Sequence, residues 1–284
     1  MDLIKRYSGK LPLEDIKGLL EISPDKTIRV NPLLTTRESL IAELKKKGFE
    51  VEEHPLHPLA IRVISEPFSV GATTEYLSGR YIVQDAASMV AVSELGIRKK
   101  GVVLDITSAP GAKTTHISEE LGGKGVVVAI DSNKKRLKSV YYNCERMGCG
   151  NVIGINMNAK DVKRLGILFD KVLIDPPCSA EGTIHKNPGL LKKEIPYKKL
   201  IKEQLAIVEA GISVLKKGGT MVYSTCTINP DENEGVVRHA LNQGMKLTEI
   251  STSGGKEGLI PMTRRFYPHT DGTQGFFIAR MVKV

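Results

Sequence analysis

From residue 101 onward, short apolar runs rich in β-branched residues alternate with longer amphipathic segments. The runs are GVVLDI (101–106), GVVVAID (125–131), NVIGIN (151–156), KVLIDPP (171–177) and TMVYSTC (220–226). The segments between them, such as 133–148 and 199–219, repeat apolar residues with the period of a helix. Continuous apolar strands that alternate with helices predict a parallel sheet covered by helices on both faces. Two more strands are expected at 246–250 and 276–284, which makes a seven-stranded sheet.

Residues 1–75 have a different pattern, which predicts a separate small α+β domain. Thr36 stands where a helix N-cap is expected, and Gly48 follows the end of the same helix. The other expected elements are a helix at 13–22 and strands at 27–32, 49–55 and 59–64. The stretch 79–96 is typical of a turn, a short extended piece and a helix that lead into the main domain. We assign that domain to residues 76–284.

Polar residues gather where the predicted strands of the main domain end. They are Asp105, Asp131, the segment 156–158, Asp175 and Cys226. Ligands of open parallel sheets bind at the carboxyl ends of the strands. The main domain is therefore predicted to hold its functional site at this edge of the sheet.

The formal net charge of +9 is unevenly distributed along the chain. Residues 1–75 contain 11 Lys and Arg against 12 Asp and Glu, so the basic excess belongs to the rest of the chain. Its densest part follows Cys178 and consists of His185, Lys186, Lys192, Lys193, Lys198, Lys199 and Lys202. A basic surface beside a reactive site favours nucleic acid as a partner. The alternative is a solvated, lysine-rich helix face.

The composition argues against several other classes of protein. No stretch approaches the roughly 18 consecutive apolar residues of a membrane span, and the N-terminus lacks the apolar core of a signal peptide. The cysteines at positions 144, 149, 178 and 226 show no paired metal-ligand spacing, so neither a metal site nor a disulfide framework is expected. We expect a soluble, cytoplasmic monomer.

The turn after the first strand of the main domain, SAPGAKT (108–114), contains one glycine, Gly111. A dinucleotide fingerprint needs G-x-G-x-x-G and a phosphate loop needs G-x-x-x-x-G-K, and neither pattern is present. A single glycine between small residues suits a ligand without a pyrophosphate, such as an adenosyl group that carries an amino acid. Asp131 is a candidate acceptor for ribose hydroxyls, or else the N-cap of the next helix. Asn158 is a candidate adenine contact, or else a turn residue.

Cys178 and Cys226 each end an apolar run, and together they suggest methyl transfer to a ring carbon of a pyrimidine. Such a carbon is a poor nucleophile until a thiolate adds to its neighbour, so the chemistry needs an activated cysteine. The residues alone do not show which of the two is the nucleophile. Asp175 is a candidate proton donor to the base, protonated in a dry pocket by our hypothesis. Lys113 is a candidate for electrostatic support of that pocket, or else for an ion pair with a neighbouring acid.

Five segments carry a resemblance to a known family, and two earlier ones support it. The five are DITSAPGAKT, AIDSNKKRL, DPPCS, YSTCT and the terminal RRFYPH with GFFIAR; the earlier two are IRVNP and GRYIVQDAAS. Together they resemble the RNA cytosine-5 methyltransferases related to Nop2, Sun and Fmu, over residues 28–282. The resemblance implies a Rossmann-like class I methyltransferase fold, S-adenosylmethionine as the methyl donor, and an archaeal-type enzyme acting on transfer RNA.

The resemblance also assigns roles residue by residue. The turn through Ser108, Ala109, Pro110, Gly111, Ala112 and Lys113 is expected to line the methionine end of S-adenosylmethionine, with Asp131 on the ribose. Arg136, Asn158 and Asp175 complete the expected cofactor contacts, although Asn158 stands where the family usually has an aspartate. Cys226 is implied to be the nucleophile, and Cys178 to take part in releasing the adduct.

The expected function is therefore methylation of cytosine C5 in structured RNA, with transfer RNA as the first substrate and ribosomal RNA as the second. A base must leave its stack to reach such a pocket. Tyr267 and His269 are candidates for stacking on bases, whereas Phe266 is expected in the core. One alternative is a methyltransferase acting on a nitrogen, but those enzymes usually carry an aromatic residue after Asp-Pro-Pro. Another is a non-catalytic RNA-binding factor on the same scaffold.

Overall fold

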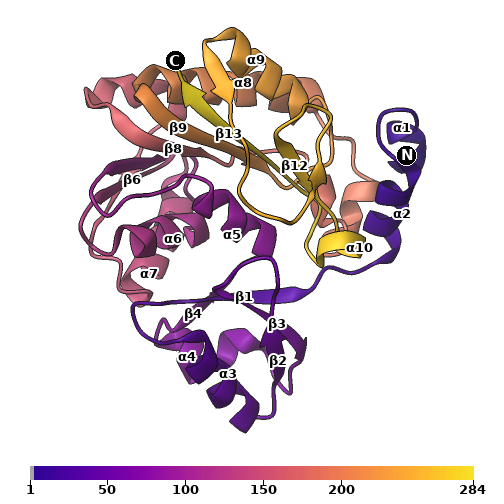
Figure 1. Cartoon of the computed structure of the whole chain (residues 1–284), viewed down its shortest axis with the longest axis vertical. Helices are drawn as coiled ribbons and strands as arrows, with labels where there is room; N and C mark the ends of the chain where they lie inside the picture. Colours follow the sequence, from indigo (N-terminus) through magenta and orange to yellow (C-terminus); the bar gives the residue numbers. More distant parts are fainter. Residues whose placement is uncertain (1–2) are drawn as a thin grey trace.

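The computed structural model describes residues 3–284 as two lobes, each built around its own sheet (Figure 1). The smaller lobe holds an antiparallel sheet with the strand order β2-β3-β1-β4. Its strands are β1 (Lys26–Val30), β2 (Glu50–Glu53), β3 (Ala60–Ser65) and β4 (Tyr81–Val83). Helix α3 (Arg37–Lys46) packs its apolar side on this sheet. The side chain of Thr36 accepts a hydrogen bond from the Ser39 backbone N–H, which confirms the predicted N-cap.

The larger lobe contains a mixed sheet of nine strands within the described residues. Its parallel part has the order β7-β6-β5-β8-β9, and the antiparallel strand β13 pairs with β9. Beyond β13 lie β12 and β11, and β10 also pairs with β13. The strands are β5 (Val102–Asp105), β6 (Val126–Asp131), β7 (Val152–Asn156), β8 (Phe169–Ile174), β9 (Leu215–Thr225), β10 (Met245–Leu247), β11 (Lys256–Glu257), β12 (Thr263–Phe266) and β13 (Phe276–Lys283).

All seven strands predicted for the large sheet are present in it, and the predicted fold class is confirmed. Two further strands, β11 and β12, were not predicted. β12 has no apolar run, because Arg264 and Arg265 occupy its middle. Arg265 is nevertheless buried, since its Nε donates a hydrogen bond of 2.8 Å to the Glu234 carboxylate. The charged residues of β12 would ordinarily indicate an exposed segment, but one of them is buried in an ion pair.

Helices cover both faces of the large sheet (Figure 1). One face packs on α5, α6 and α7, and the other on α8 and α9. Neighbouring residues of β8 point in opposite directions: Leu173 joins the core under α5 and α6, whereas Val172 and Ile174 join the core under α8 and α9. These helices are α5 (Ala86–Ser93), α6 (Ala112–Leu121), α7 (Lys134–Arg146), α8 (Tyr197–Val214) and α9 (Glu234–Asn242).

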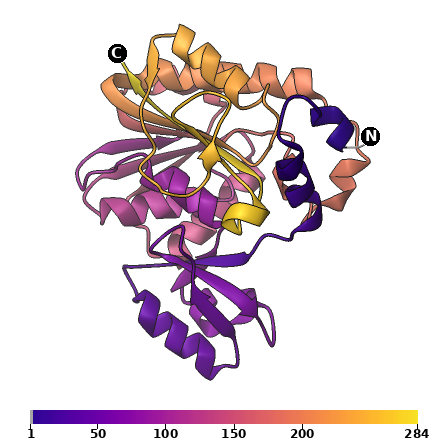
Figure 2. The same ribbon diagram turned by 45° about the vertical axis from the view of Figure 1, so that its right-hand side comes forward.

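The N-terminal helices α1 (Leu3–Tyr7) and α2 (Leu13–Glu21) lie against the larger lobe (Figure 2). Their apolar residues share a core with Ile184, Ile228 and Tyr267 from that lobe. Strand β4, in contrast, follows residue 75 but pairs with β1 of the small sheet. A domain boundary at residue 75 remains a prediction. These contacts show that helices before residue 75 pack on the larger lobe, and that a strand after it belongs to the smaller one.

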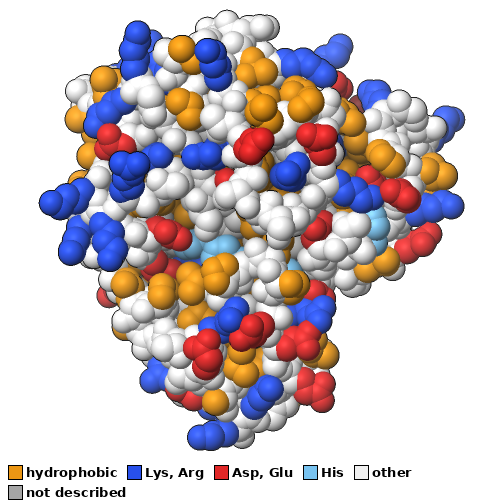
Figure 3. All heavy atoms as spheres, viewed as in Figure 1, with side chains coloured by type: hydrophobic (Ala, Val, Ile, Leu, Met, Phe, Trp, Pro, Cys, Tyr) orange, Lys and Arg blue, Asp and Glu red, His pale blue; other side chains and the backbone are white. Residues whose placement is uncertain are grey.

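The remaining elements are short. They are α4 (Thr74–Leu77), α10 (Pro268–Asp271) and the 3₁₀ helices η1 (Val70–Ala72), η2 (Ala159–Leu165), η3 (Glu181–Thr183) and η4 (Pro188–Leu191). Among residues 3–284, no helix combines the length and the hydropathy that crossing a membrane requires. Lys and Arg side chains gather on the left of Figure 3, at the edge of the larger lobe farthest from α1 and α2.

A fully buried arginine joins the two lobes. Arg29 lies on β1 of the small sheet, and its side chain is inaccessible to solvent. Its Nη2 donates to Glu119 Oε1 at 2.7 Å and to Thr115 Oγ1 at 2.9 Å, both on α6 of the larger lobe. Its Nη1 donates to the backbone oxygen of Ala112 at 2.7 Å and also contacts Gln84. The small lobe is therefore bonded to the first residue of α6.

Replacement of Arg29 by alanine is predicted to destabilise the fold strongly. It would leave the Glu119 carboxylate buried without its cation, which costs about 3–5 kcal/mol. Arg37→Ala is the control, because it breaks only pairs with the exposed acids Glu53 and Glu38, each worth less than about 1 kcal/mol. Chemical denaturation of both variants measures the difference. Equal losses of unfolding free energy would contradict a special role for Arg29.

Candidate active site

The turn between β5 and α6 requires its glycine for two independent reasons. Gly111 has φ of +107°, a conformation that residues with a Cβ rarely adopt. A Cβ added there would also lie 3.0 Å from the Cα of Val140 on α7. The turn is thus pressed against α7, and the carbonyl of Pro110 accepts a hydrogen bond of 3.0 Å from Asn143. The Ala109–Pro110 peptide bond is cis.

Asp105, at the end of β5, supports this turn from below. Its Oδ2 accepts a hydrogen bond of 2.7 Å from Thr114 Oγ1, near the start of α6. Burial raises the pKa of Asp105 to about 6, although the bond from Thr114 acts in the opposite direction. Since only 1% of its surface is exposed, Asp105 stabilises the turn rather than facing a ligand.

Asp131 ends β6 beside the same turn. Its Oδ1 accepts a hydrogen bond of 2.8 Å from the Asn133 backbone, and its Oδ2 lies 3.7 Å from Nη2 of Arg136. Arg136 also donates to the backbone oxygen of Ala109 at 2.9 Å. Asn133 is the N-cap of α7, so the alternative interpretation of Asp131 as that cap is wrong. Asp131 instead faces a cavity.

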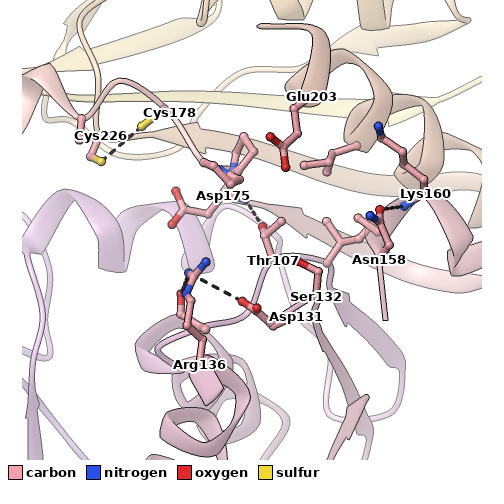
Figure 4. Close-up of a pocket in the computed structure, with 17 residues that line it drawn as sticks. Thr107, Asp131, Ser132, Arg136, Asn158, Lys160, Asp175, Cys178, Glu203 and Cys226 are labelled. Carbon is pink, nitrogen blue, oxygen red and sulfur yellow. Dashed lines mark hydrogen bonds and ion pairs between the residues drawn. The ribbon is translucent and has the colours of Figure 1, made fainter. Parts of the chain in front are cut away.

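This cavity, of about 300 Å³, opens at the carboxyl ends of the parallel strands, as predicted (Figure 4). Asp131 and Asn158 lie on one side of it, the two cysteines lie on the other, and Asp175 stands between them. Asn158 lines the cavity, and its Oδ1 caps η2 by accepting from the Lys160 N–H at 3.0 Å. The adenine contact stays a prediction. The cavity therefore joins the expected cofactor side to the expected chemical side.

An ion pair connects the cofactor turn to the chemical side of the cavity. Nζ of Lys113, in the first turn of α6, donates to Asp175 Oδ2 at 2.6 Å. Ser224 of β9 donates to the other oxygen, Oδ1, at 3.1 Å. Burial works against the Lys113 cation, but the charge of Asp175 outweighs it, and the pKa of Lys113 is raised. Lys113 is thus a fixed positive charge that also acts on Cys226.

Cys178 and Cys226, which are far apart in the sequence, lie side by side in the structure. Their Sγ atoms lie 3.5 Å apart, although Cys178 follows β8 and Cys226 follows β9. The hydrogen bond with Cys226 and burial both raise the pKa of Cys178 well above its ordinary value. Cys178 therefore holds its proton, and its S–H can donate to the Sγ of Cys226.

The predicted site residues fall into two groups. The cavity is lined by Ala109, Asp131, Arg136, Asn158, Asp175, Cys178 and Cys226. The others build the turn around it, namely Ser108, Pro110, Gly111, Ala112 and Lys113. Ser108 is buried, and its hydroxyl donates to the Ile130 backbone oxygen at 3.0 Å, which ties the turn to β6.

Sequence reasoning missed Thr107, Ser132, Lys160 and Glu203 in the cavity wall. Thr107 and Ser132 lie two residues and one residue after strands β5 and β6. The expectation that ligands bind at the carboxyl ends of the strands could therefore have found both. Glu203 had no such signal, because it belongs to α8 and stands in the lysine-rich stretch. Only the packing of α8 over the strand ends brings its carboxylate to the cavity.

The aromatic residues near the C-terminus do not form a stacking surface. Phe266 is buried in the core, as expected. Tyr267 is also buried, at 1% exposure, against Leu and Ile side chains of α1 and α2, so its predicted stacking role is wrong. His269 lies with its Nε2 3.2 Å from Asp15. The N-terminal helices, whose packing the sequence pattern did not predict, cover this surface.

The basic segment after Cys178 is exposed. Its cations Lys186, Lys192, Lys193, Lys198, Lys199 and Lys202 are solvent-accessible, and none of them forms an ion pair within residues 3–284. Glu181 anchors the start of this segment, since its carboxylate contacts Arg6, Tyr7 and Tyr197. Within the same range of residues, no three His, Cys, Asp or Glu side chains are grouped to hold a metal ion.

Comparison with known proteins places this chain in a family. The model of the family described as 16S rRNA methyltransferase RsmB/F matches residues 92–282. The model of the ferredoxin-like domain of RsmF/B-like methyltransferases matches residues 3–70. The chain is thus matched over most of its length by two domains that occur in one family.

Individual relatives agree with these matches. The chain is 40% identical over 233 residues to a tRNA (cytosine(72)-C(5))-methyltransferase of Pyrococcus horikoshii, covering 80% of this chain and 59% of the relative. It is 33% identical over 305 residues to the human 28S rRNA (cytosine(4447)-C(5))-methyltransferase, covering 99% and 37%. The chain therefore spans only about four- to six-tenths of these relatives.

A solved structure supports the fold. NSun6 from Pyrococcus horikoshii, determined with the ligand SFG, matches with a TM-score of 0.92 and 29% identity, covering 99% of this chain and 97% of that one. The ligand SFG in that neighbour's structure is an analogue of S-adenosylmethionine. The chain belongs to the RsmB/F family, the RNA cytosine-5 methyltransferases related to Nop2 and Sun.

Proposed function

We propose that this chain transfers a methyl group from S-adenosylmethionine to C5 of a cytosine in RNA, through a covalent bond between Cys226 and C6 of the base. The observation that carries the proposal is the pair of sulfur atoms 3.5 Å apart, in one cavity with Asp175 and Asp131. A methyltransferase acting on a nitrogen needs no second cysteine. The proposal has the protein acting in the cytoplasm, as a monomer and without a metal.

The residues around the turn suit S-adenosylmethionine. The cavity wall carries both signs of charge, with Arg136 and Lys160 facing Asp131 and Glu203, which suits a zwitterionic ligand. Asp131 would accept from the ribose hydroxyls, and Asn158 would contact the adenine. The turn around Gly111, which presents Thr107 and Ala109 to the cavity, would hold the methionine end. Bound there, S-adenosylmethionine supplies an electrophilic methyl group.

Cys226 would act as the nucleophile. Its thiolate adds to C6 of cytosine, and the electron pair of the C5–C6 double bond becomes available at C5 for the methyl group. Lys113, whose charge acts on Cys226, stabilises the thiolate. Asp175 lies where it can bond N3 or the exocyclic amine of the base, once it gives up its contact with Lys113 or Ser224. The charge that develops on the ring is negative, so Asp175 would take up a proton in that exchange and donate a hydrogen bond to the ring, as the hypothesis of a protonated Asp175 requires.

Cys178 would take part in releasing the product. After methylation the C5 proton goes to a base, the C5–C6 double bond re-forms, and the Cys226 thiolate leaves with the electrons of the C–S bond. Cys178 keeps its proton and touches the Sγ of Cys226, so it can stabilise the leaving thiolate by a hydrogen bond. The role of Cys178 as hydrogen-bond donor to the Sγ of Cys226 supports the assignment of Cys226 as the nucleophile.

Transfer RNA is the first candidate substrate, because the relative with 40% identity is named for it. Ribosomal RNA is the second, because the human relative and the matching family model are named for it. The exposed lysines after Cys178 would bind backbone phosphates beside the target base, which must leave its stack to enter the cavity.

Asp131→Ala is predicted to weaken cofactor binding. Hydrogen bonds to a charged acceptor contribute about 1.5–3 kcal/mol, so the Kd for S-adenosylmethionine should rise about 10- to 100-fold. Isothermal titration without RNA measures this. Asp231→Ala, at an exposed position, is the control and should leave the Kd unchanged. An unchanged Kd in a folded Asp131→Ala protein would remove Asp131 from the cofactor site.

The cysteine roles are tested with radiolabelled S-adenosylmethionine, transfer RNA and denaturing electrophoresis. Cys226→Ala should lose activity by about 10³-fold or more and form no RNA-linked protein. Cys178→Ala should also lose turnover, but should accumulate an RNA-linked band, because the adduct forms and is not released. Cys149→Ala is the matched control and should behave like the wild type, since Cys149 lies outside the cavity.

Two results would overturn parts of this assignment. A band only in Cys226→Ala would exchange the two roles and leave the reaction intact. Methyl incorporation that survives in Cys226→Ala without any band would show transfer to a nitrogen or an oxygen, and the covalent mechanism would be wrong.

A further inference from the structure

A second cavity, of about 530 Å³, lies at the opposite edge of the large sheet. Its walls come from the segment before β5, the start of β8, the first residues of β9 and the second half of β13. Since β5, β8 and β9 are parallel, this is the edge of their amino ends. Asp175 follows the cavity residues Asp170 and Lys171 by five and four residues of extended chain, so the cavity lies roughly 15 Å from Asp175.

The walls of this cavity carry almost only positive charge. Its cations are Arg98, Lys100, Lys171, Lys216, Lys217 and Arg280, and its single acid is Asp170. The Asp170 carboxylate is already engaged, because it accepts from Lys216 Nζ at 2.6 Å and from the Val102 backbone at 2.9 Å. The other five cations form no ion pair within the described part of the chain. The active-site cavity, in contrast, carries both signs of charge.

Lys171 stands at the centre of this unbalanced charge. Lys171 lies on β8 and lines the cavity, and its Nζ donates to Thr220 Oγ1 at 2.8 Å. Burial, Arg280 and Arg98 all lower the pKa of Lys171. Nε of Arg280 is buried and has no hydrogen-bond acceptor among residues 3–284. Like charges held this close repel each other, and an anion bound between them would relieve the repulsion.

We propose that this cavity is a phosphate-binding subsite for the backbone of the RNA substrate, remote from the reacting base. Arginine and lysine side chains that converge on a hollow suit the oxygens of a phosphate. The inference rests on the proposed function, because it takes RNA as the substrate. It extends that function by giving the enzyme a contact roughly 15 Å from Asp175, on the far side of the sheet from the reacting base.

The surroundings of the cavity favour a polyanion over a single free phosphate. Lys99 and Lys100 follow Arg98 on an exposed loop, and Lys217 lies exposed on the opposite rim, so the cations extend beyond what one phosphate needs. The Lys and Arg side chains gathered on the left of Figure 3 lie at this edge of the lobe. An RNA strand that passes over the rim would place one phosphate in the hollow and its neighbours on these lysines.

The test is a double variant, Arg98→Ala with Lys217→Ala, both exposed and without ion-pair partners in the described residues. The variant should bind the RNA that the wild type methylates about tenfold more weakly. The slope of the logarithm of its binding constant against the logarithm of salt concentration should be smaller in magnitude by about two. Activity at saturating RNA should be unchanged, because neither residue touches the active site. Arg238→Ala with Lys246→Ala is the matched control, since it removes the same two charges from the exposed surface of α9 and β10.

Three outcomes would overturn the inference. Equal weakening in both double variants would mean that only net charge matters, and unchanged binding in both would remove the subsite. If inorganic phosphate binds the wild type and not the Arg98/Lys217 variant while RNA binding stays equal, the cavity holds a free anion instead. Methylation of the same RNA by the wild type is measured in parallel. Failure of that reaction refutes the proposed function, whereas methylation with unaltered RNA binding refutes only the subsite.

Discussion

The buried guanidinium of Arg29 links the small lobe to the chemistry of the large one. It bonds Ala112, Thr115 and Glu119, all on the first three turns of α6. The same helix carries Lys113, which reaches the Asp175 carboxylate beyond the next strand of the sheet. Because a buried charge must keep its partners, the small lobe and α6 are held in one arrangement. The turn at Gly111 directly precedes α6, so its position and that of the cavity beside it are fixed in the same way.

The two sides of the active-site cavity differ in the charge and the chemistry of their side chains. Asp131, Arg136 and Lys160 offer both signs of charge on the side proposed for S-adenosylmethionine. On the other side the two sulfur atoms lie 3.5 Å apart, and the hydrogen bond with Cys226 and burial raise the pKa of Cys178, so that Cys178 holds its proton. One site thus provides a ligand pocket of mixed charge next to a thiol pair beside a fixed cation. These are the components that methyl transfer to a poorly nucleophilic carbon requires.

The large sheet was predictable because its parallel strands are buried on both faces and therefore appear as unbroken apolar runs. The site was predictable where its residues end those runs, as Asp131, Asp175 and Cys226 do. β12 was not predictable, because its buried Arg265 depends on Glu234 from a helix 31 residues away. The burial of Tyr267 and the position of Glu203 also depend on helices that pack from elsewhere in the chain. Such tertiary contacts leave no local pattern.

The central claim is that the methyl group replaces the hydrogen at C5 of cytosine. RNA labelled with tritium at cytosine C5 tests this directly, when it is incubated with the wild-type protein and S-adenosylmethionine. Release of one tritium into water for each methyl group incorporated is the predicted result, because the C5 proton must leave before the bond to Cys226 breaks. Methyl incorporation with the tritium retained in the RNA would contradict the claim and place the methyl group on another atom.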